Sequence, residues 1–444
     1  MRRDRWFFFL VLALTVRFGF LLAVAHPEIR SGSFELRADT DESDYHGLAL
    51  SLATTGEYRL GPDHPATAFR PPGTVLPIAA LYRLLGPLPA LGVLYVMVCS
   101  VLIVLLLGVL AHRISGSQRV TAIALLMACL MPTLVFTSTG IWSDTPALLF
   151  ILLSLYLVLA ERPPPRNLAV AGASLGLAYI NRPSAGLLIA LVGALLLREA
   201  WARRQLRGVV LFGLLAGLPI LGWGMWNVTS LGKFFIGNTQ STVTLWQANN
   251  AVTAGLRAPV PATANGFDLA QEAAAGRYLG SWVPLPYIAD SNPWSDRSLP
   301  ELEAEDWLRQ QVVDFIRENP AAYLRLLTYK GWRILTAEPT APSVLAESPG
   351  KRRLKRLATF GERWLILLLG SYGMVLLWRR SPRTTLYHLV YLAAGLAVVF
   401  VAYPNARILL PVTAVLIVPT ALAIAQLADR LGMWRSAPSA QAKP

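Results

Sequence analysis

The chain has few charged residues and almost no cysteine. Charged residues make up 15% of its 444 residues and hydrophobic ones 54%, whereas a soluble domain carries about 25% charged residues. Cys99 and Cys129 both fall inside apolar runs, so no disulfide framework joins the polar segments. The five histidines show no metal-ligand spacing. These features exclude a disordered chain, argue against a soluble zinc enzyme, and disfavour an ordinary soluble enzyme.

Apolar runs are what the chain has in abundance. A helix that crosses a bilayer needs about 20 apolar residues. Ten runs are candidates, and they cover residues 6–25, 88–112, 119–137, 143–160, 167–181, 183–198, 208–228, 362–379, 385–403 and 407–428. The sequence therefore predicts an all-α polytopic membrane protein with about ten transmembrane helices.

The positions of the basic residues predict the orientation. Most of the net charge of +14 lies beside apolar runs. With a cytoplasmic N-terminus, the inner segments hold 17 Lys and Arg residues, and the short outer loops hold only Arg182 and Arg407. Because short loops rich in Lys and Arg stay cytoplasmic, we expect both termini in the cytoplasm. The Ala, Leu and Arg content suggests a bacterial inner membrane, with the active site on the periplasmic face.

This topology divides the chain into three parts. Residues 1–228 form an N-terminal bundle of seven spans that includes the first outer loop, 26–87. Residues 229–360 form a small mixed outer domain, and residues 361–444 form the C-terminal spans and a short inner tail. In the outer domain a β-prone stretch, 234–250, precedes an amphipathic helix at 300–318 and a second helix capped by Asn319. Residues 74–85 are expected to form an interfacial helix.

The first outer loop carries a dense acidic motif, Asp41-Glu42-Ser43-Asp44-Tyr45. One interpretation is structural, because acidic residues stabilise the positive end of a helix, here expected at 45–56. The other is catalytic, because desolvation at a membrane surface raises the pKa of a carboxylate and suits it to act as a general base. The motif alone leaves both open.

Several arginines and a further aspartate lie near the expected outer ends of spans. In Arg70-Pro71-Pro72 the prolines fix an extended turn, and a guanidinium matches phosphate geometry. The equal alternative for Arg70 is an arginine whose charged end reaches the interface. Asp144 could be catalytic or a simple helix start. Arg17, inside the first span, together with Arg182 and Arg407, completes this set of ionisable residues. Such residues usually face the interior of a helix bundle, and the alternative for Arg17 is a paired structural arginine or one whose charged end reaches the interface. The basic run 351–356 stands before span eight on the outer side, where it could hold anionic lipid or form a solvated stalk.

Taken together, these motifs resemble the C-superfamily of membrane glycosyltransferases, in the branch of protein O-mannosyltransferases and aminoarabinose transferases (glycosyltransferase family 39-like). The family's Asp-Glu-x-x-Tyr motif is similar to 41–45, and its basic residue with two prolines is similar to 70–72. Its second acidic residue is similar to Asp144, and its late arginine segment to Asn405-Ala406-Arg407. A polar stretch early in its large outer loop is similar to Gly237-Asn238 and Asn249-Asn250.

The resemblance implies an inverting transfer of a sugar from a polyprenyl-phosphate donor to an acceptor hydroxyl. It implies catalytic roles for Asp41 as general base and for Glu42 and Asp144. It implies donor-phosphate contacts from Arg70, Arg17, Arg182 and Arg407. Substrate-binding roles fall to Asp44, Tyr45, Asn249 and Asn250.

Other possibilities stay open at this point. A transporter or flippase of lipid-linked sugars would use the same phosphate site without a base, and a non-catalytic assembly partner would need neither the phosphate site nor the base.

The expected partners are the polyprenyl-phosphate sugar, a glycan, lipid or protein acceptor, and membrane lipids, with no nucleic acid. No metal site is expected, although a divalent cation at Asp41 and Asp144 stays open as a cofactor. The sugar, the acceptor and the lipid chain length do not follow from the sequence.

Overall fold

The structure is a computed structural model that describes residues 3–26, 28–29, 34, 36, 40–257, 288, 298–336 and 349–433. Within these residues the β-type pairing is a single isolated bridge between Arg59 and Ala66, which confirms the predicted all-α class. The helices are α1 (Arg3–Phe20), η1 (Leu21–Ala25), α2 (Asp41–Thr55), α3 (Pro72–Leu85), α4 (Pro89–Ser115), α5 (Gln118–Leu130), α6 (Pro132–Phe136), α7 (Asp144–Val158), α8 (Pro165–Asn181), α9 (Ala185–Arg203), α10 (Arg207–Leu231), α11 (Thr239–Ala248), α13 (Glu301–Glu318), α14 (Pro320–Thr336), α16 (Pro349–Arg380), α17 (Pro382–Val401) and α18 (Leu410–Arg430).

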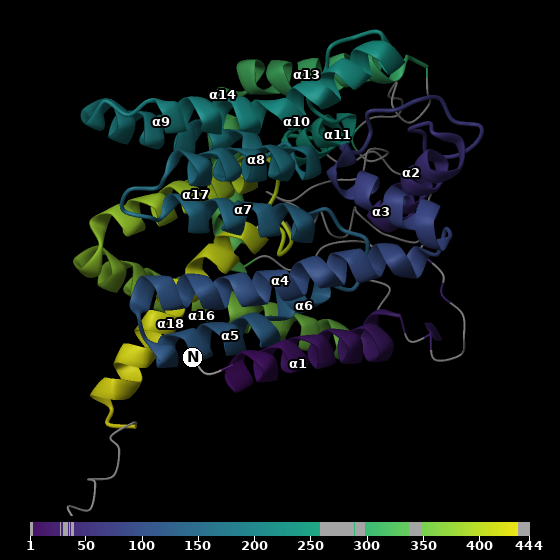
Figure 1. Cartoon of the computed structure of the whole chain (residues 1–444). Helices are drawn as coiled ribbons and strands as arrows, with labels where there is room; N and C mark the ends of the chain where they lie inside the picture. The colour runs from purple at the N-terminus through teal and green to yellow at the C-terminus, as the bar shows by residue number, and fades with distance from the viewer. Residues whose placement is uncertain are drawn as a thin grey trace, which may run out of the picture.

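Each of the ten predicted spans contains a helix, and most of these helices run along one common direction (Figure 1). Within the described residues, seven segments are long and apolar enough to cross a membrane: α1 with η1, α4, α9, α10, residues 357–380 of α16, α17 and α18. The apolar helices α5 and α7 are shorter, and α8 has 17 residues. The chain is therefore a multi-pass membrane protein.

The predicted span 119–137 is interrupted where α5 ends and α6 begins at Pro132. A proline has no backbone N–H to continue the helix. From α16, Glu362 Oε2 accepts hydrogen bonds from both the backbone N–H and the hydroxyl of Thr133, each at 2.9 Å. A side chain from a distant helix therefore satisfies the free donors at the start of α6.

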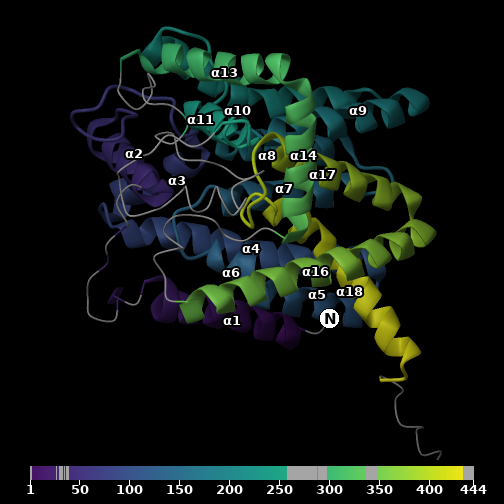
Figure 2. The same ribbon diagram turned by 180° about the vertical axis from the view of Figure 1, so that it is seen from behind.

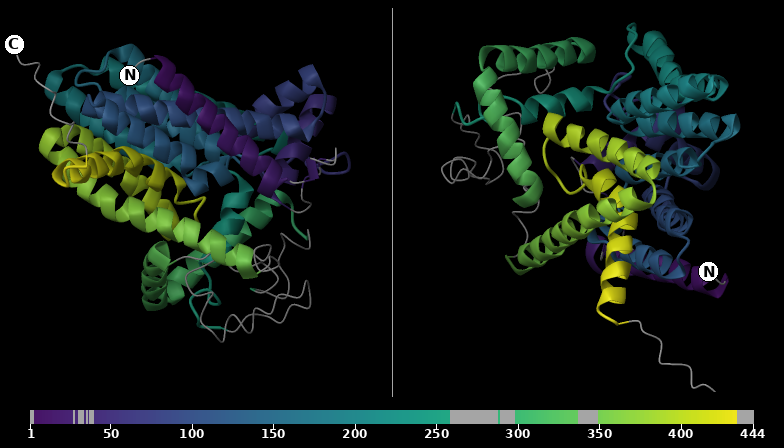
Figure 3. Two further views of the ribbon diagram at one scale, coloured as in Figure 1. Left: turned by 90° about the horizontal axis from the view of Figure 1, so that it is seen from below. Right: turned by 90° about the vertical axis from the view of Figure 1, so that its left-hand side faces the viewer.

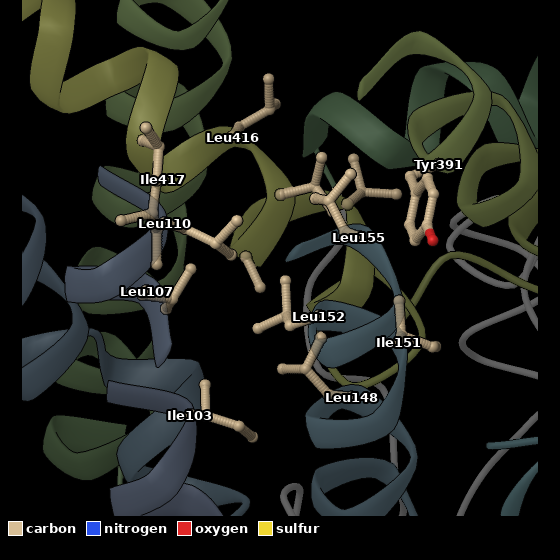
Figure 4. Packing of buried hydrophobic residues seen from close by; sticks show 14 of the residues in the cluster. Ile103, Leu107, Leu110, Leu148, Ile151, Leu152, Leu155, Tyr391, Leu416 and Ile417 are labelled. Carbon is tan, nitrogen blue, oxygen red and sulfur yellow. The ribbon is translucent and has the colours of Figure 1, made fainter. Parts of the chain in front are cut away.

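The largest hydrophobic cluster of the described residues joins side chains from most of the long helices, among them α4, α5, α7, α16, α17 and α18. α18 passes through its middle, and 78% of its most apolar 18-residue window is buried. Because lipid tails are as apolar as leucine, close packing rather than removal from water stabilises these contacts. Figure 4 shows the interlocking side chains, among them Ile103, Leu107, Leu110, Leu148, Ile151, Leu152, Leu155, Tyr391, Leu416 and Ile417.

The two ends of the bundle carry different elements. α1 begins and α18 ends at one end, whereas α2, α3 and α11 lie at the other (Figures 1 and 3). This agrees with an arrangement in which both termini share one side and the two long segments share the opposite side. Which side of a membrane each end faces stays a prediction.

The outer helices follow the predicted pattern with one exception. α13 and α14 begin after Pro300 and Asn319, as expected, and α14 runs across the long helices instead of along them (Figure 2). The β-prone interpretation of 234–250 is wrong, because residues 239–248 form α11. Val243 and Trp246 lie one helical turn apart and pack on α13 in a shared hydrophobic cluster, so the helical period places both on one buried face.

α16 is longer than the predicted span 362–379. It begins at Pro349 and continues as one helix to Arg380. The basic run 351–356 therefore belongs to the first turns of this helix. The side chains of the run lie outside the described residues.

Candidate active site

The acidic motif forms the first turn of α2. Thr40 is the N-cap; its backbone N–H donates to Ser43 Oγ at 3.1 Å, and the Ser43 hydroxyl donates back to the carbonyl of Thr40 at 2.7 Å. Asp41, Glu42 and Asp44 follow within that turn, where the free N–H groups of the helix favour negative charge. The structural interpretation of the motif is therefore correct, and it is compatible with the catalytic one, because the same turn holds the carboxylates in fixed positions.

Arg70 reaches this turn from the segment before α3. Pro71 is the N-cap of α3 and Pro72 its first residue, so two restricted residues direct the preceding arginine. Arg70 Nη2 donates to Asp41 Oδ1 at 2.6 Å and to Asp44 Oδ2 at 2.7 Å. The side chain is 9% exposed. Its guanidinium carbon lies 5.4 Å from the ring centroid of Tyr45, so an aromatic ring lines the buried cation.

Gly73 completes the Arg70-Pro71-Pro72 turn by allowing α3 to approach α8. A Cβ at this position would lie 2.7 Å from the carbonyl oxygen of Ile180 and 2.5 Å from Asn181 Nδ2. Thr74 Oγ1 also donates to Asn181 Oδ1 at 2.7 Å. The close approach links the segment of Arg70 to the end of α8, which leads directly into Arg182.

Replacing this glycine should separate the two helix ends. For Gly73→Ala we expect a lower thermal unfolding temperature, with a loss of about 1–3 kcal/mol from overpacking. The matched control is Gly213→Ala in α10, where a Cβ has nothing within 4 Å. Equal unfolding temperatures for the two variants would contradict this packing account.

Asp144 is a second carboxylate, and it forms ion pairs with two arginines. It occupies the first position of α7, and its side chain is 1% exposed. Arg407, from the segment between α17 and α18, donates from Nη2 to Asp144 Oδ2 at 2.8 Å and to Asp41 Oδ2 at 2.8 Å. Arg182, which caps the end of α8, forms an ion pair with Asp144 Oδ1. Arg407 therefore joins the two carboxylates that the sequence separates by about a hundred residues.

Asp41 stands at the centre of this charged cluster. One of its oxygens accepts from Arg70 and the other from Arg407. Burial by itself raises the pKa of this carboxyl, but the two guanidinium charges outweigh burial and hold the pKa well below its ordinary value. We call the six residues the charged cluster; it comprises the carboxylates of Asp41, Asp44 and Asp144 and the guanidiniums of Arg70, Arg182 and Arg407.

Glu42 and several aromatic residues surround the cluster. Glu42 is 6% exposed, and a Cβ at Gly140 would lie 2.0 Å from its Oε1 and 2.3 Å from Nε1 of Trp142. The Tyr45 hydroxyl is hydrogen-bonded to Ser143, and burial raises the pKa of Tyr45. These contacts hold Glu42 and Tyr45 against the turn that leads into Asp144.

Sequence reasoning did not select Trp142 or Tyr403. The guanidinium carbon of Arg407 lies 4.0 Å from the ring centroid of Trp142, a distance at which a cation is attracted to an aromatic face. The Tyr403 phenol interacts electrostatically with Arg407, Asp41 and Arg182. Both aromatics adjoin segments that the sequence did mark, so their proximity to Asp144 and Arg407 was the available signal.

Three of the predicted site residues make no described contact with the charged cluster. Arg17 is fully buried, and its donors go to Ser100 Oγ at 2.8 Å and to the carbonyls of Ala13 and Ala128. Asn249 binds backbone carbonyls and a lysine. Asn250 closes its own turn through Val252 and Thr253. Their roles in binding phosphate or substrate stay predictions.

For a metal ion, the described residues hold no suitable group of three or more histidine, cysteine, aspartate or glutamate side chains. In the charged cluster the carboxylates instead have arginine partners. A cation at Asp41 and Asp144 would have to share those oxygens with Arg70, Arg182 and Arg407.

Comparison with known proteins identifies a matching family for part of the chain. Residues 69–226 match the family described as dolichyl-phosphate-mannose-protein mannosyltransferase. The match begins immediately before Arg70 and includes Asp144 and Arg182. No curated protein sequence matches the chain.

The fold is similar to that of the oligosaccharyltransferase of Archaeoglobus fulgidus. The structure tethered to an acceptor peptide has a TM-score of 0.54 and 15% identity, and the match covers 98% of this chain and 51% of that one. The complex with an inhibitory peptide and a dolichol-phosphate has a TM-score of 0.52 and 16% identity, over 98% and 52% of the two chains. This chain therefore spans about half the length of the oligosaccharyltransferase.

ArnT from Cupriavidus metallidurans bound to undecaprenyl phosphate is a weaker match. Its TM-score is 0.40 at 15% identity, over 98% of this chain and 82% of that one. The family match and the oligosaccharyltransferase match both agree with the resemblance: residues 69–226, which include Arg70-Pro71-Pro72 and Asp144, match the mannosyltransferase family, and the chain is a polytopic membrane protein whose fold is similar to that of the archaeal oligosaccharyltransferase.

Proposed function

We propose that the chain transfers a sugar from a polyprenyl-phosphate donor to an acceptor hydroxyl at the outer face of the membrane, with inversion at the anomeric carbon. One observation supports the proposal: Asp41 lies between Arg70 and Arg407, at the end of the bundle where α2, α3 and α11 lie. The proposed base therefore lies next to two guanidiniums of the kind that bind phosphate. The complex of the oligosaccharyltransferase with a dolichol-phosphate supports a lipid-phosphate donor for this fold.

The donor's lipid tail stays in the bilayer, so its phosphate is presented near the membrane surface. Arg70, Arg182 and Arg407 supply the positive charge that stabilises the polyprenyl phosphate as it leaves. The acceptor oxygen forms a bond to the anomeric carbon while the bond from that carbon to the phosphate oxygen breaks. Asp41 accepts the proton of the acceptor hydroxyl. Glu42 and Asp44 would bind sugar or acceptor hydroxyls, and Asp144 orients Arg407 and Arg182.

Because of these ion pairs, the basicity of Asp41 should depend on whether the donor is bound. While both arginines hold Asp41, its pKa stays far below the range in which a general base is effective at neutral pH. A donor phosphate that draws Arg70 and Arg407 onto itself reduces their hold on Asp41. The pKa of Asp41 should then rise, so that the base becomes effective only when a donor is in place.

This coupling predicts two different pH profiles. In the free enzyme the depressed pKa of Asp41 places the acid limb of kcat/KM for the donor below the ordinary aspartate pKa of about 3.9. In the donor complex the pKa is higher, so the acid limb of kcat should lie at higher pH than that of kcat/KM. Steady-state transfer rates measured between pH 4 and 8 test this, because kcat should fall toward the acid end of this range while kcat/KM for the donor stays level. Coincident limbs would contradict the release of Asp41 by the donor.

The outer-face location requires its own test. Thr54, in the first outer loop, and Trp201, at the end of α9, are both exposed. In intact cells a membrane-impermeant thiol reagent should label Thr54→Cys, whereas Trp201→Cys should require permeabilisation. The native Cys99 and Cys129 are buried and serve as the unlabelled background. The reverse labelling pattern would overturn the periplasmic assignment of the charged cluster.

A transporter of lipid-linked sugars is the alternative, since the same arginines would bind its cargo. Proteoliposomes with a radiolabelled polyprenyl-phosphate sugar and a hydroxyl acceptor separate the two functions. The transferase releases polyprenyl phosphate and a labelled glycoside in equal amounts. Movement of intact donor between leaflets, without glycoside, would support the transporter instead.

A further inference from the structure

The helices of the large outer segment hold both arginine-bearing segments through backbone groups. At the start of α11, the Thr239 backbone N–H donates to the carbonyl of Ala68 at 3.1 Å, and Asn238 Nδ2 donates to the carbonyl of Phe69 at 3.2 Å. From α13, Glu301 Oε1 accepts from the Ala68 N–H at 3.0 Å. These bonds fix the two residues that directly precede Arg70.

The other end of α11 holds the segment that leads to Arg407. Asn249, which follows α11, donates from Nδ2 to the carbonyl of Val401 at 2.8 Å. Lys330 of α14 donates from Nζ to Asn249 Oδ1 at 2.7 Å, to the carbonyl of Phe400 at 2.9 Å and to that of Val401 at 3.4 Å. Both carbonyls belong to the last turn of α17.

The bonds of Lys330 require its charged form. The three partners of Nζ are all acceptors, and only an ammonium offers three donors. The last carbonyls of α17 form the negative end of a helix, where a cation is favourable. Lys330 is nevertheless fully buried, and burial lowers its pKa to about 7. Burial of an ammonium costs free energy, and here its hydrogen bonds to the end of α17 offset part of that cost.

Residues 402–406 connect the end of α17 to Arg407, and this short segment has hydrogen bonds of its own. After Val401 the chain turns, and the Arg407 backbone N–H donates to Asn405 Oδ1 at 3.0 Å. The Leu409 N–H donates to the Asn405 carbonyl at 2.9 Å as α18 begins. The position of Val401 therefore limits where the Arg407 guanidinium can lie relative to Asp41.

We propose that α11 is a strut that sets the separation of the two arginine-bearing segments, with Asn249 and Lys330 as positioning residues that act on donor binding through Arg407. The ten residues of α11 span about 15 Å at 1.5 Å per residue, and backbone contacts lie at each end. Neither positioning residue touches the charged cluster in the described contacts. The inference rests on the proposed function for the role of Arg407 but not for the mechanical link.

Hydrogen–deuterium exchange tests the link without any measurement of activity. In Lys330→Met, amide exchange in residues 402–409 should rise by about tenfold, the change expected from the loss of roughly one hydrogen bond. Lys330→Arg keeps the charge and should recover part of the protection. Asn249→Asp keeps the acceptor for Lys330, loses the donor to Val401, and provides a milder second variant. The control is Lys233→Met, at an exposed lysine of the same outer segment that pairs with Asp306.

Transfer assays then test the action through Arg407. Lys330→Met should raise the KM for the donor severalfold more than it lowers kcat, and in an Arg407→Gln background it should cause no further loss. Unchanged exchange at 402–409, or a uniform rise through α11, α13 and α14, would overturn the positioning role. If the wild type transfers no sugar while exchange responds as expected, the proposed function fails and the strut stands.

Discussion

Replacing Asp41 by Asn should lower the rate of sugar transfer by about 10²- to 10⁴-fold, the usual contribution of a general base. Donor binding should persist, because Arg70 and Arg407 keep their other carboxylate partners, Asp44 and Asp144. The amide is close in shape to the carboxylate but cannot take a proton at neutral pH. The rate of transfer is measured with a radiolabelled sugar at saturating donor, and the affinity for the donor is measured in a separate binding assay.

Asp44→Asn is the matched control for this substitution. Asp44 shares Arg70 with Asp41, and no described contact joins it to Arg407. We expect a smaller loss of transfer, because the carboxylate between the two arginines remains. A larger loss for Asp44→Asn than for Asp41→Asn would assign the base to Asp44. Near wild-type transfer by both variants would exclude Asp41 and Asp44 as the general base.

The second large effect concerns Arg407. Replacing it by Gln removes the contacts that join Asp41 to Asp144, so we expect transfer to fall by about 10²- to 10³-fold, as when a charge-stabilising donor is lost. Breaking a buried ion pair costs about 3–5 kcal/mol. For Arg407→Gln the loss of unfolding free energy should lie at or below the lower end of that range, because Arg407 is 24% exposed and Arg182 still pairs with Asp144. Transfer assays and thermal unfolding measure the two effects.

Arg407→Lys separates charge from geometry. A lysine keeps the positive charge but cannot make the two-pronged contact of a guanidinium, so transfer should be intermediate. The control is Arg119→Gln, at an ion pair with Asp429 in which both side chains are 58% exposed. Such surface pairs contribute about 0–1 kcal/mol, and transfer should be unchanged. Equal transfer by Arg407→Gln and wild type would exclude Arg407 from the site.

The helical spans and most of the charged cluster were predictable from the sequence. Long apolar runs have few structural alternatives, because a bilayer requires backbone groups to be satisfied within each helix. Asp41, Arg70, Asp144, Arg182 and Arg407 all lie near the expected outer ends of spans. A shared side therefore predicts that they can meet, but it does not predict that Arg407 bridges Asp41 and Asp144.

Other features depended on contacts that no local pattern encodes. Arg17 fits the rule that a charge within a span faces a functional cavity, yet backbone carbonyls and Ser100 satisfy it. The residues of α11 have a β-prone composition, and packing on α13 decides in favour of a helix. Lys330 stands in an unremarkable amphipathic pattern, and its importance becomes visible only when the end of α17 is placed beside it.

Binding of polyprenyl phosphate tests the central claim most directly, namely that the charged cluster receives a lipid-borne phosphate. Native mass spectrometry of the purified protein can count bound lipid for the wild type, Asp41→Asn, Arg407→Gln and Arg119→Gln. The account predicts one bound polyprenyl phosphate for the wild type and Arg119→Gln, equal or tighter binding for Asp41→Asn, and loss of binding for Arg407→Gln. Wild-type binding by Arg407→Gln would place the phosphate elsewhere and contradict the account.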